Sequence, residues 1–213
     1  MEPEQRAARR VEIKDPRAGK PSIQRYYVTP SYVTAEPGEA EALDLLMKIT
    51  GSGATSRLYQ KLVAKDKVAS TAGGWYGGSS MDFGKIAVYA VPADGVSLSE
   101  VEAAIDAVLA DIVANGVTEA ELQRAKKSYL AEYIYESDNQ ATLARRYGWG
   151  LVVGRTVEDI ESWPERISKV TREDIQKVAA RYFDPRRSVT GTLLPVPPEG
   201  VEQTRTSAPN GRS

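Results

Sequence analysis

The sequence predicts an α+β fold in which a mainly antiparallel sheet carries helices packed on one face. Three observations lead to this class. Apolar side chains recur at every second position near both ends of the chain and in a pair of segments before its middle, which is the period of a strand. They recur at every third and fourth position through most of the second half, which is the period of a helix. Strands and helices do not alternate strictly, so a doubly wound parallel sheet is not expected.

Five segments have the pattern of strands. Residues 10–14 alternate apolar and charged side chains, which indicates a strand with one wetted face. Residues 22–29 are rich in Ile, Tyr and Val and lie between two prolines. Residues 68–76 and 83–91 are joined by a Gly- and Ser-rich link, as in a hairpin. Residues 188–194 predict a last strand.

Helices are expected wherever apolar residues recur at helical spacing. Two precede the hairpin, at about 37–48 and 55–64, and about five fill residues 97–182. Several of them begin at a capping box, in which Ser or Thr is followed three residues later by an acid. We expect these boxes at Ser99–Glu102, Thr118–Glu121, Thr156–Asp159 and Thr171–Asp174.

The domain organisation is simple. Residues 1–8 are charged and small, and residues 195–213 are rich in Pro, Ser and Gly, so we expect a flexible N-terminal arm and a flexible tail. Residues 9–194 form one α+β domain, which is large enough to bury a core without a disulfide or a metal.

Composition excludes much familiar chemistry. The chain has no Cys and no His, which excludes disulfides, thiolate zinc sites, His-based triads and a His zinc motif. The net charge of −1 argues against binding nucleic acid. No apolar run approaches the roughly 20 residues of a membrane span. No signal peptide is visible, so the compartment stays open between cytoplasm and periplasm.

Two clusters are better explained by structure than by chemistry. The Gly51–Ser56 segment lacks the Gly-Lys-Ser/Thr ending of a phosphate loop and follows a helix, so it is interpreted as a helix–helix link. Glu100, Glu102 and Asp106 could form an acid/base or cation site. We interpret them instead as the solvated face of a helix, with the first two favoured by the helix dipole.

The segment Gly73-Gly74-Trp75-Tyr76 is unusual for a strand, because glycines inside a strand weaken it. Such glycines occur at a bulge or where another backbone comes close. One interpretation is a core aromatic pair beside a bulge. The other is an exposed strand edge that faces a peptide-binding chamber and pairs with an extended peptide.

Several motifs together resemble one known family. They are residues 37–49, 56–62, 69–70, 75–76, 83–84, 89–92, 118–126, 170–175 and 182–188. In order and spacing this set is similar to the C-terminal half of bacterial zinc metallopeptidases of the pitrilysin/insulinase family, over about residues 22–194.

The resemblance implies a layout and a role. The family builds a clamshell from two related α/β half-units. One half carries an inverted zinc motif, His-x-x-Glu-His, and the other lacks the metal and closes the chamber over the peptide. Since the chain has no His, it corresponds to the metal-free half. No cofactor is therefore expected in this chain, and zinc is expected in an N-terminal half or partner subunit. Peptide substrate and a homo- or hetero-oligomer are further implied partners.

The resemblance also locates a missing pair. Many members carry an Arg and a Tyr seven residues apart that bind substrate and steady the oxyanion. In register, this chain has Val63 and Ser70, which cannot do so. Arg57 and Tyr59 lie nearby but out of register. We therefore expect no peptidase activity from the chain alone. Two alternatives stay open: a stand-alone, non-proteolytic scaffold or assembly protein of the same fold, and a small-molecule enzyme using Tyr, Lys or carboxylates.

Overall fold

The computed structural model describes residues 7–196, and most of the arm and tail expected at the two ends lies outside this range. One five-stranded sheet runs through it, in the order β1-β5-β2-β4-β3. All neighbouring strands are antiparallel except β1 and β5, which are parallel. The strands are β1 Arg9–Asp15, β2 Ser22–Pro30, β3 Ala69–Gly77, β4 Phe83–Pro92 and β5 Ser188–Pro195.

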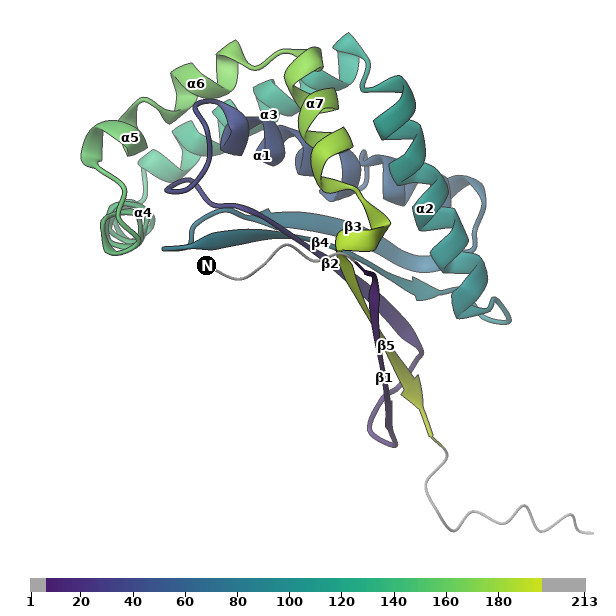
Figure 1. The fold of residues 1–213 in the computed structure, drawn as a ribbon. Helices are drawn as coiled ribbons and strands as arrows, with labels where there is room; N and C mark the ends of the chain where they lie inside the picture. The colour runs from purple at the N-terminus through teal and green to yellow at the C-terminus, as the bar shows by residue number, and fades with distance from the viewer. Residues whose placement is uncertain (1–6, 197–213) are drawn as a thin grey trace, which may run out of the picture.

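The helices cover one face of the sheet, with α4 beyond the end of the strands (Figure 1), which confirms the predicted fold class. They are α1 Glu39–Gly51, α2 Leu98–Asn115, α3 Glu119–Ser137, α4 Gln140–Val152, α5 Val157–Glu161, α6 Trp163–Lys169 and α7 Arg172–Tyr182. A π-helical segment, η1 Tyr59–Lys65, follows α1, and a 3-10 turn, η2 Pro185–Arg187, precedes β5. No helix within residues 7–196 has both the length and the apolar character needed to cross a bilayer.

The helix starts differ from expectation at two places. The side chain of Ser97, not Ser99, caps α2, because Ser97 accepts the hydrogen bond from the Glu100 backbone N–H. The box at Thr156 predicted one helix start in this part of the chain, but residues 156–169 form two short helices, α5 and α6. Pro164 lies in the first turn of α6, where its missing N–H would have had no helical partner. The expected boxes at Thr118, Thr156 and Thr171 are confirmed.

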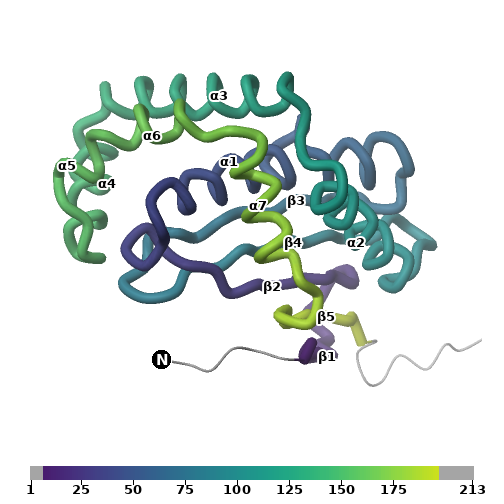
Figure 2. The backbone as a smooth tube through the Cα atoms, turned by 45° about the horizontal axis from the view of Figure 1, so that its top comes forward, coloured from purple at the N-terminus to yellow at the C-terminus, as the bar shows by residue number. Residues whose placement is uncertain are grey.

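The core lies between the sheet and the helical layer, and α1 is its centre (Figure 2). On β2, Ile23 and Tyr27 face the helices and are buried, while Gln24 and Val28, each the next residue along the strand, are exposed. On α1, buried residues occur all round the helix rather than on one stripe. This is because α1 contacts β3 below and α3, α6 and α7 on its other sides. A helix covered in this way supplies much of the apolar burial that stabilises the domain.

The face of α2 that was expected to be fully solvated is partly used for ion pairs. Buried Arg25 of β2 reaches Glu102 at 2.6 Å and also pairs with Asp106. Arg10 of β1 reaches the other oxygen of Glu102 at 2.6 Å. The solvated interpretation is therefore wrong for Glu102, which fastens α2 to two strands. The hydrogen bond from Arg10 is the main cause that lowers the pKa of Glu102.

Candidate functional site

The four residues predicted as a peptide-pairing edge lie consecutively on β3, the outermost strand of the sheet on its side. Each is opposite a residue of β4: Gly73 pairs with Tyr89, Gly74 with Val88, Trp75 with Ala87 and Tyr76 with Ile86. The irregular step of β3 falls between Ala69 and Thr71, not at the glycines. The bulge interpretation of Gly73-Gly74 therefore does not explain them.

A close backbone contact inside the domain does explain the two glycines. The last residue of α1, Gly51, lies directly against Gly74, and a Cβ on Gly51 would be 2.3 Å from the Gly74 nitrogen. A Cβ on Gly74 would be 2.7 Å from both the Ala87 carbonyl oxygen and the Met47 methyl group. A Cβ on Gly73 would be 3.0 Å from the Gly51 carbonyl oxygen. The three glycines Gly51, Gly73 and Gly74 therefore let the end of α1 pack on β3. This packing reason could not be read from the sequence, since Gly51 is far from Gly74 along the chain.

Trp75 and Tyr76 point to opposite faces of the sheet and do not form a core pair. The Trp75 side chain is 43% exposed, and the Lys85 ammonium lies 5.5 Å from its ring centre. Tyr76 is on the helical side, where its hydroxyl donates to the Pro30 carbonyl oxygen at 2.7 Å. Burial is the main cause that raises the pKa of Tyr76. Of the two aromatic residues, Trp75 is the one exposed on the surface.

Trp75 belongs to a wider exposed apolar face of the sheet. The side chains that point away from the helices include large apolar residues on four strands, and no helix in residues 7–196 covers them (Figure 1). We call this surface the open face. Its exposed large residues are Val11, Ile13, Val28, Trp75 and Phe83.

The two positions of the missing pair are occupied in other ways. Val63 lies on η1 and packs, partly buried, against the core. Ser70 lies at the irregular step of β3, and its hydroxyl donates to the carbonyl oxygens of Val91 and Pro92 at 3.3 Å. Arg57, close to Val63 in sequence, is held by Glu121 at 2.7 Å and by Asp111 at 3.0 Å. None of the three side chains is placed as a free donor.

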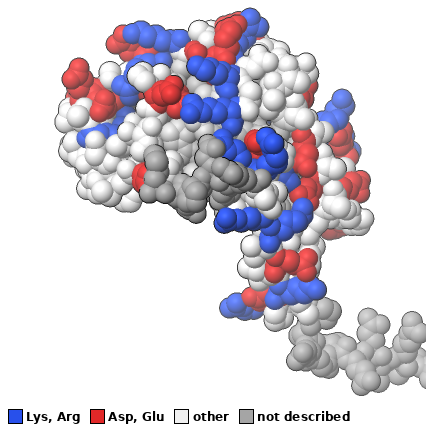
Figure 3. Space-filling view, viewed as in Figure 1, with Lys and Arg blue, Asp and Glu red and all other residues white. Residues whose placement is uncertain are grey.

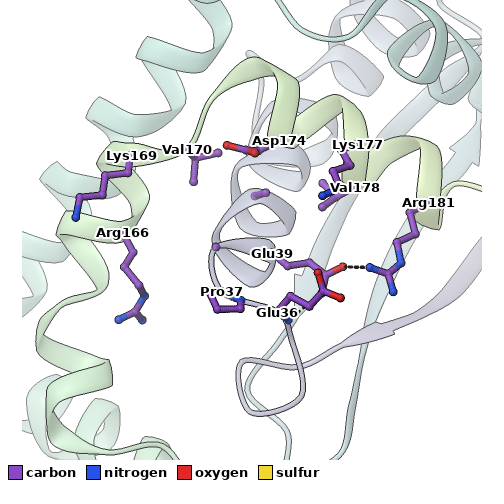
Figure 4. Close-up of a pocket in the computed structure, with 12 residues that line it drawn as sticks. Glu36, Pro37, Glu39, Arg166, Lys169, Val170, Asp174, Lys177, Val178 and Arg181 are labelled. Atoms are coloured by element: carbon purple, nitrogen blue, oxygen red, sulfur yellow. Dashed lines mark hydrogen bonds and ion pairs between the residues drawn. The ribbon is translucent and has the colours of Figure 1, made fainter.

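A charged cavity of about 210 Å³ separates the start of α1 from α6 and α7 (Figure 4). Glu39 accepts hydrogen bonds from Arg181 at 2.8 Å and from the Tyr182 hydroxyl at 2.7 Å. Arg166 pairs with the buried Glu41 at 2.7 Å. These ion pairs join α1 to α6 and α7, so the charges lining the cavity are largely used by the fold itself. Sequence reasoning missed them because the partners are more than a hundred residues apart.

The chemistry available to the described chain is limited. Residues 7–196 contain no group of three or more His, Cys, Asp or Glu side chains that could hold a metal ion. Acidic and basic side chains are interspersed over the helices on the face seen in Figure 3.

Comparisons with known proteins agree with this picture. Residues 1–129 match the family described as the peptidase M16 inactive domain. A protease from Helicobacter pylori has the same fold, with a TM-score of 0.83 and 23% identity over 91% of this chain and 45% of that chain. The inactive peptidase domain from Bordetella parapertussis has a TM-score of 0.74 and 20% identity, over 84% of this chain and 92% of that chain.

A chain of complex III from Candida albicans is also similar, with a TM-score of 0.71 and 16% identity, over 86% of this chain and 45% of that chain. At such identities these structures establish the fold alone. The chain spans 45% of the Helicobacter pylori structure, which is about half of it. None of the curated proteins compared with the chain matches it.

Proposed function

Because this chain belongs to the peptidase M16 family, as an inactive domain, we propose that it is the metal-free C-terminal half of a zinc metalloendopeptidase. A zinc-bearing half, supplied by another segment or by a partner subunit, carries the metal and the general base. The proposed role of this chain is to close the peptide-binding chamber over that half. Excluding water from a closed chamber strengthens the electrostatic interactions that act on the scissile bond.

The observation that carries this proposal is the open face of the sheet. The helices cover the opposite face, where the core forms. On the open face, five large apolar side chains stay exposed: Val11, Ile13, Val28, Trp75 and Phe83. An exposed apolar surface of this kind is typical of a face that contacts another chain. The match in length to about half of a larger protease structure supports a two-half arrangement.

The edge strand gives the proposed chamber a way to hold substrate. An extended peptide can add to an exposed sheet edge through its main chain, which tolerates many side-chain sequences. Strand β3, with Gly73, Gly74, Trp75 and Tyr76, is at such an edge. We propose that peptide pairs there, although the glycines themselves serve the contact with α1.

Reconstitution tests the chamber role. The chain is mixed with its zinc-bearing counterpart, and EDTA-sensitive cleavage of a fluorogenic peptide is measured with each part alone and with both together. We expect cleavage only from the mixture. Full activity of the zinc-bearing half without this chain would contradict the proposal.

Substrate modification tests the edge strand without altering the protein. Backbone N-methylation removes single N–H donors from the peptide while leaving its side chains in place. If main-chain pairing with β3 holds the peptide, methylation at alternate positions should raise KM, and methylation at the intervening positions should not. Equal effects at all positions would contradict strand pairing.

The second candidate is a non-proteolytic assembly role. It is favoured by the similarity in fold to a chain of complex III. A stable complex that contains this chain but cleaves no peptide, with or without added zinc, would support it over the peptidase role.

A further inference from the structure

A second cavity, of about 260 Å³, lies where α4, α5 and α6 gather at one end of the helical layer, beside α3 and the end of β3 (Figure 1). Its walls are unusually aromatic. The rings that line it are those of Tyr32, Tyr76, Tyr129, Tyr133 and Trp163. Trp163 joins two of them, with centroids 5.8 Å from Tyr129 in an edge-on contact and 5.6 Å from Tyr133 in a stacked one. We call this cavity the aromatic pocket.

The carboxylate of Asp44 on α1 also lines the aromatic pocket. One of its oxygens accepts a hydrogen bond from the Tyr32 hydroxyl. No Lys or Arg among residues 7–196 forms an ion pair with it, since Lys48 of the same helix turns to Glu132 at 2.5 Å and Arg155 stacks on the Tyr32 ring at 4.4 Å. Asp44 is therefore an acid without an ion-pair partner among residues 7–196, in a pocket that Arg146 and Arg155 also line.

The hydrogen-bond donors of the aromatic pocket are mostly engaged within the protein. The Trp163 N–H donates to the Tyr32 hydroxyl at 2.6 Å, and the Tyr129 hydroxyl donates to the Asp44 carbonyl oxygen at 3.2 Å. Tyr76 is bound to Pro30, as described above. Arg146 is held by Glu136 at 2.7 Å and lies 4.0 Å from the centre of the Tyr133 ring.

The hydrogen-bond acceptors of the aromatic pocket, unlike its donors, are only partly engaged within the protein. Asp44, Glu132 and Glu136 each bring two carboxylate oxygens, and the hydrogen bonds to their side chains use one oxygen of each. The surplus in the aromatic pocket is thus mainly in acceptor oxygens, because the rings of Tyr32, Tyr129 and Tyr133 each already have a protein cation stacked on them. That surplus matches a ligand that carries donors and positive charge.

We propose that the aromatic pocket binds an organic cation, an alkyl ammonium or guanidinium group of the size of a lysine or arginine side chain. Its charge pairs with Asp44, and its aliphatic stem lies against the tyrosine and tryptophan rings. The cation comes either from a free amine or from a basic residue of a peptide. This inference does not depend on the peptidase role, because it concerns the chain by itself.

An anion is a poorer occupant of the same space. The guanidinium groups of Arg146 and Arg155 are already stacked on rings and bound to protein oxygens. An incoming anion would also meet three carboxylates. Burial is the main cause that raises the pKa of Asp44 to about 7, and a bound cation would favour its ionised form.

The test uses NMR titration of the intact chain with N-acetyl-lysine methylamide and with n-butylguanidinium. The matched neutral probe is N-acetyl-norleucine methylamide, which has the same length without the charge. We expect the cations to shift the signals of the pocket tyrosines and Trp163 at concentrations up to about 10 mM, and the neutral probe to leave them unchanged. A peptide with one central lysine, compared with its norleucine version, distinguishes the two sources, since tighter binding of the peptide points to a peptide residue.

Two variants locate the site. Asp44→Asn keeps an acceptor for Tyr32 but removes the charge, and we expect it to weaken cation binding roughly tenfold or more. Tyr133→Leu removes one wall and should weaken binding while leaving Asp44 intact. The control is Asp94→Asn, which makes the same charge change at a carboxylate that is almost fully exposed and paired with Lys20.

The outcomes decide the proposal. Binding that is lost in both pocket variants and kept in the control supports it. Equal binding of lysine and norleucine probes, unchanged binding in Asp44→Asn, or no signal change with any cation overturns it. Thermal melting of each variant ensures that a loss of binding is not a loss of fold.

Discussion

At the scale of single residues, the contact between Gly51 and Gly74 sets how closely α1 lies on the sheet. Neither glycine has a positive φ, so neither is required by backbone conformation. Both are required by space: a Cβ on Gly51 would meet the backbone of Gly74, and a Cβ on Gly74 would meet the Ala87 carbonyl oxygen as well as the Met47 methyl group. Glycine loses more backbone entropy on folding than other residues, and close packing of the core offsets this cost at the two positions.

We predict that Gly74→Ala destabilises the domain by about 1–3 kcal/mol, because the new methyl group overlaps the Ala87 carbonyl oxygen and the Met47 side chain. Urea unfolding followed by circular dichroism measures the change. Gly19→Ala is the matched control, since a Cβ there would meet nothing within 4 Å. Equal stability of the two variants would show that α1 does not pack on β3 in this way.

Asp44 predicts a dependence of stability on pH. Its pKa in the folded chain is raised to about 7, mainly by burial, whereas an unfolded Asp titrates near pH 4. The folded state therefore holds its proton more tightly, and this stabilisation is lost as pH rises through about 4 to 7. Asp44→Asn, which has no proton to lose, should gain in melting temperature relative to the wild type between pH 5 and pH 8.

The charged and titratable neighbours of Asp44 do not reverse this expectation. They are Tyr32, Glu41, Lys48, Tyr129, Glu132, Glu136, Arg146 and Arg155. Glu121, whose pKa is lowered to about 2, chiefly by its hydrogen bond from Arg57, is ionised throughout the tested range. A melting-temperature difference that stays constant from pH 5 to pH 8 would mean that Asp44 titrates normally.

At the scale of elements, helix α4 offers a paired test of propensity against packing. Gly148 is exposed, and a Cβ there would meet nothing within 4 Å. Gly150 is buried, and a Cβ there would lie 2.6 Å from the Ile160 methyl group of α5. The same substitution on one helix therefore meets open space in one case and a neighbouring helix in the other.

We predict that Gly148→Ala stabilises the domain by up to about 1 kcal/mol, the usual advantage of Ala over Gly inside a helix. Gly150→Ala should lose most or all of this gain, because Ile160 must move. Thermal and urea unfolding of both variants measures the difference. If Gly150→Ala were the more stable of the two, α5 would not pack against α4 as described.

Local sequence signals predicted most helices and strands. The features that were not predicted depend on contacts between residues far apart in the sequence. The boxes at Thr118, Thr156 and Thr171 need only residues three apart, so the sequence alone locates these helix starts. Pro164 was ambiguous, since proline both ends one helix and opens the next. The parallel pairing of β1 with β5 depends on partners about 180 residues apart, which no local pattern encodes.

The candidate sites also combine residues that a local pattern singles out with partners that are distant in the sequence. Gly73 and Gly74 could be singled out because glycine pairs are poor strand formers, but their partner Gly51 could not. The aromatic pocket had one usable signal, which was Asp44 inside the otherwise apolar run from Ala42 to Met47. A lone acid among buried neighbours indicates a special environment. Its aromatic partners come from four separate segments and could not be assembled from spacing.

At the scale of the whole molecule, the domain is one-sided. Helices cover one face of the sheet, and apolar side chains are exposed on the other, the open face. We predict that Val28→Glu, on the open face, leaves the free chain folded but disrupts assembly with the zinc-bearing half. Val28 is 51% exposed and lies opposite Lys85 on β4, so Glu is tolerated in the free chain.

Val157→Glu is the control for this prediction. Val157 is 46% exposed and begins α5 on the helical side, where an acid is favoured by the helix dipole. Size-exclusion chromatography of mixtures with the zinc-bearing half compares the two variants. Assembly that is lost with Val157→Glu and kept with Val28→Glu would place the interface on the helices instead.

The position of β5 between β1 and β2 also constrains how the protein is made. On the ribosome, β2 and the β3–β4 hairpin emerge early and can pair while the helices follow. β1 emerges before all of them, yet its one strand neighbour among residues 7–196, β5, follows about 180 residues later. Strand β1 therefore stays unpaired while the residues between it and β5 are synthesised, and long-range pairing of this kind is slow to form. The charges that alternate along β1 discourage it from joining a neighbouring chain during that wait.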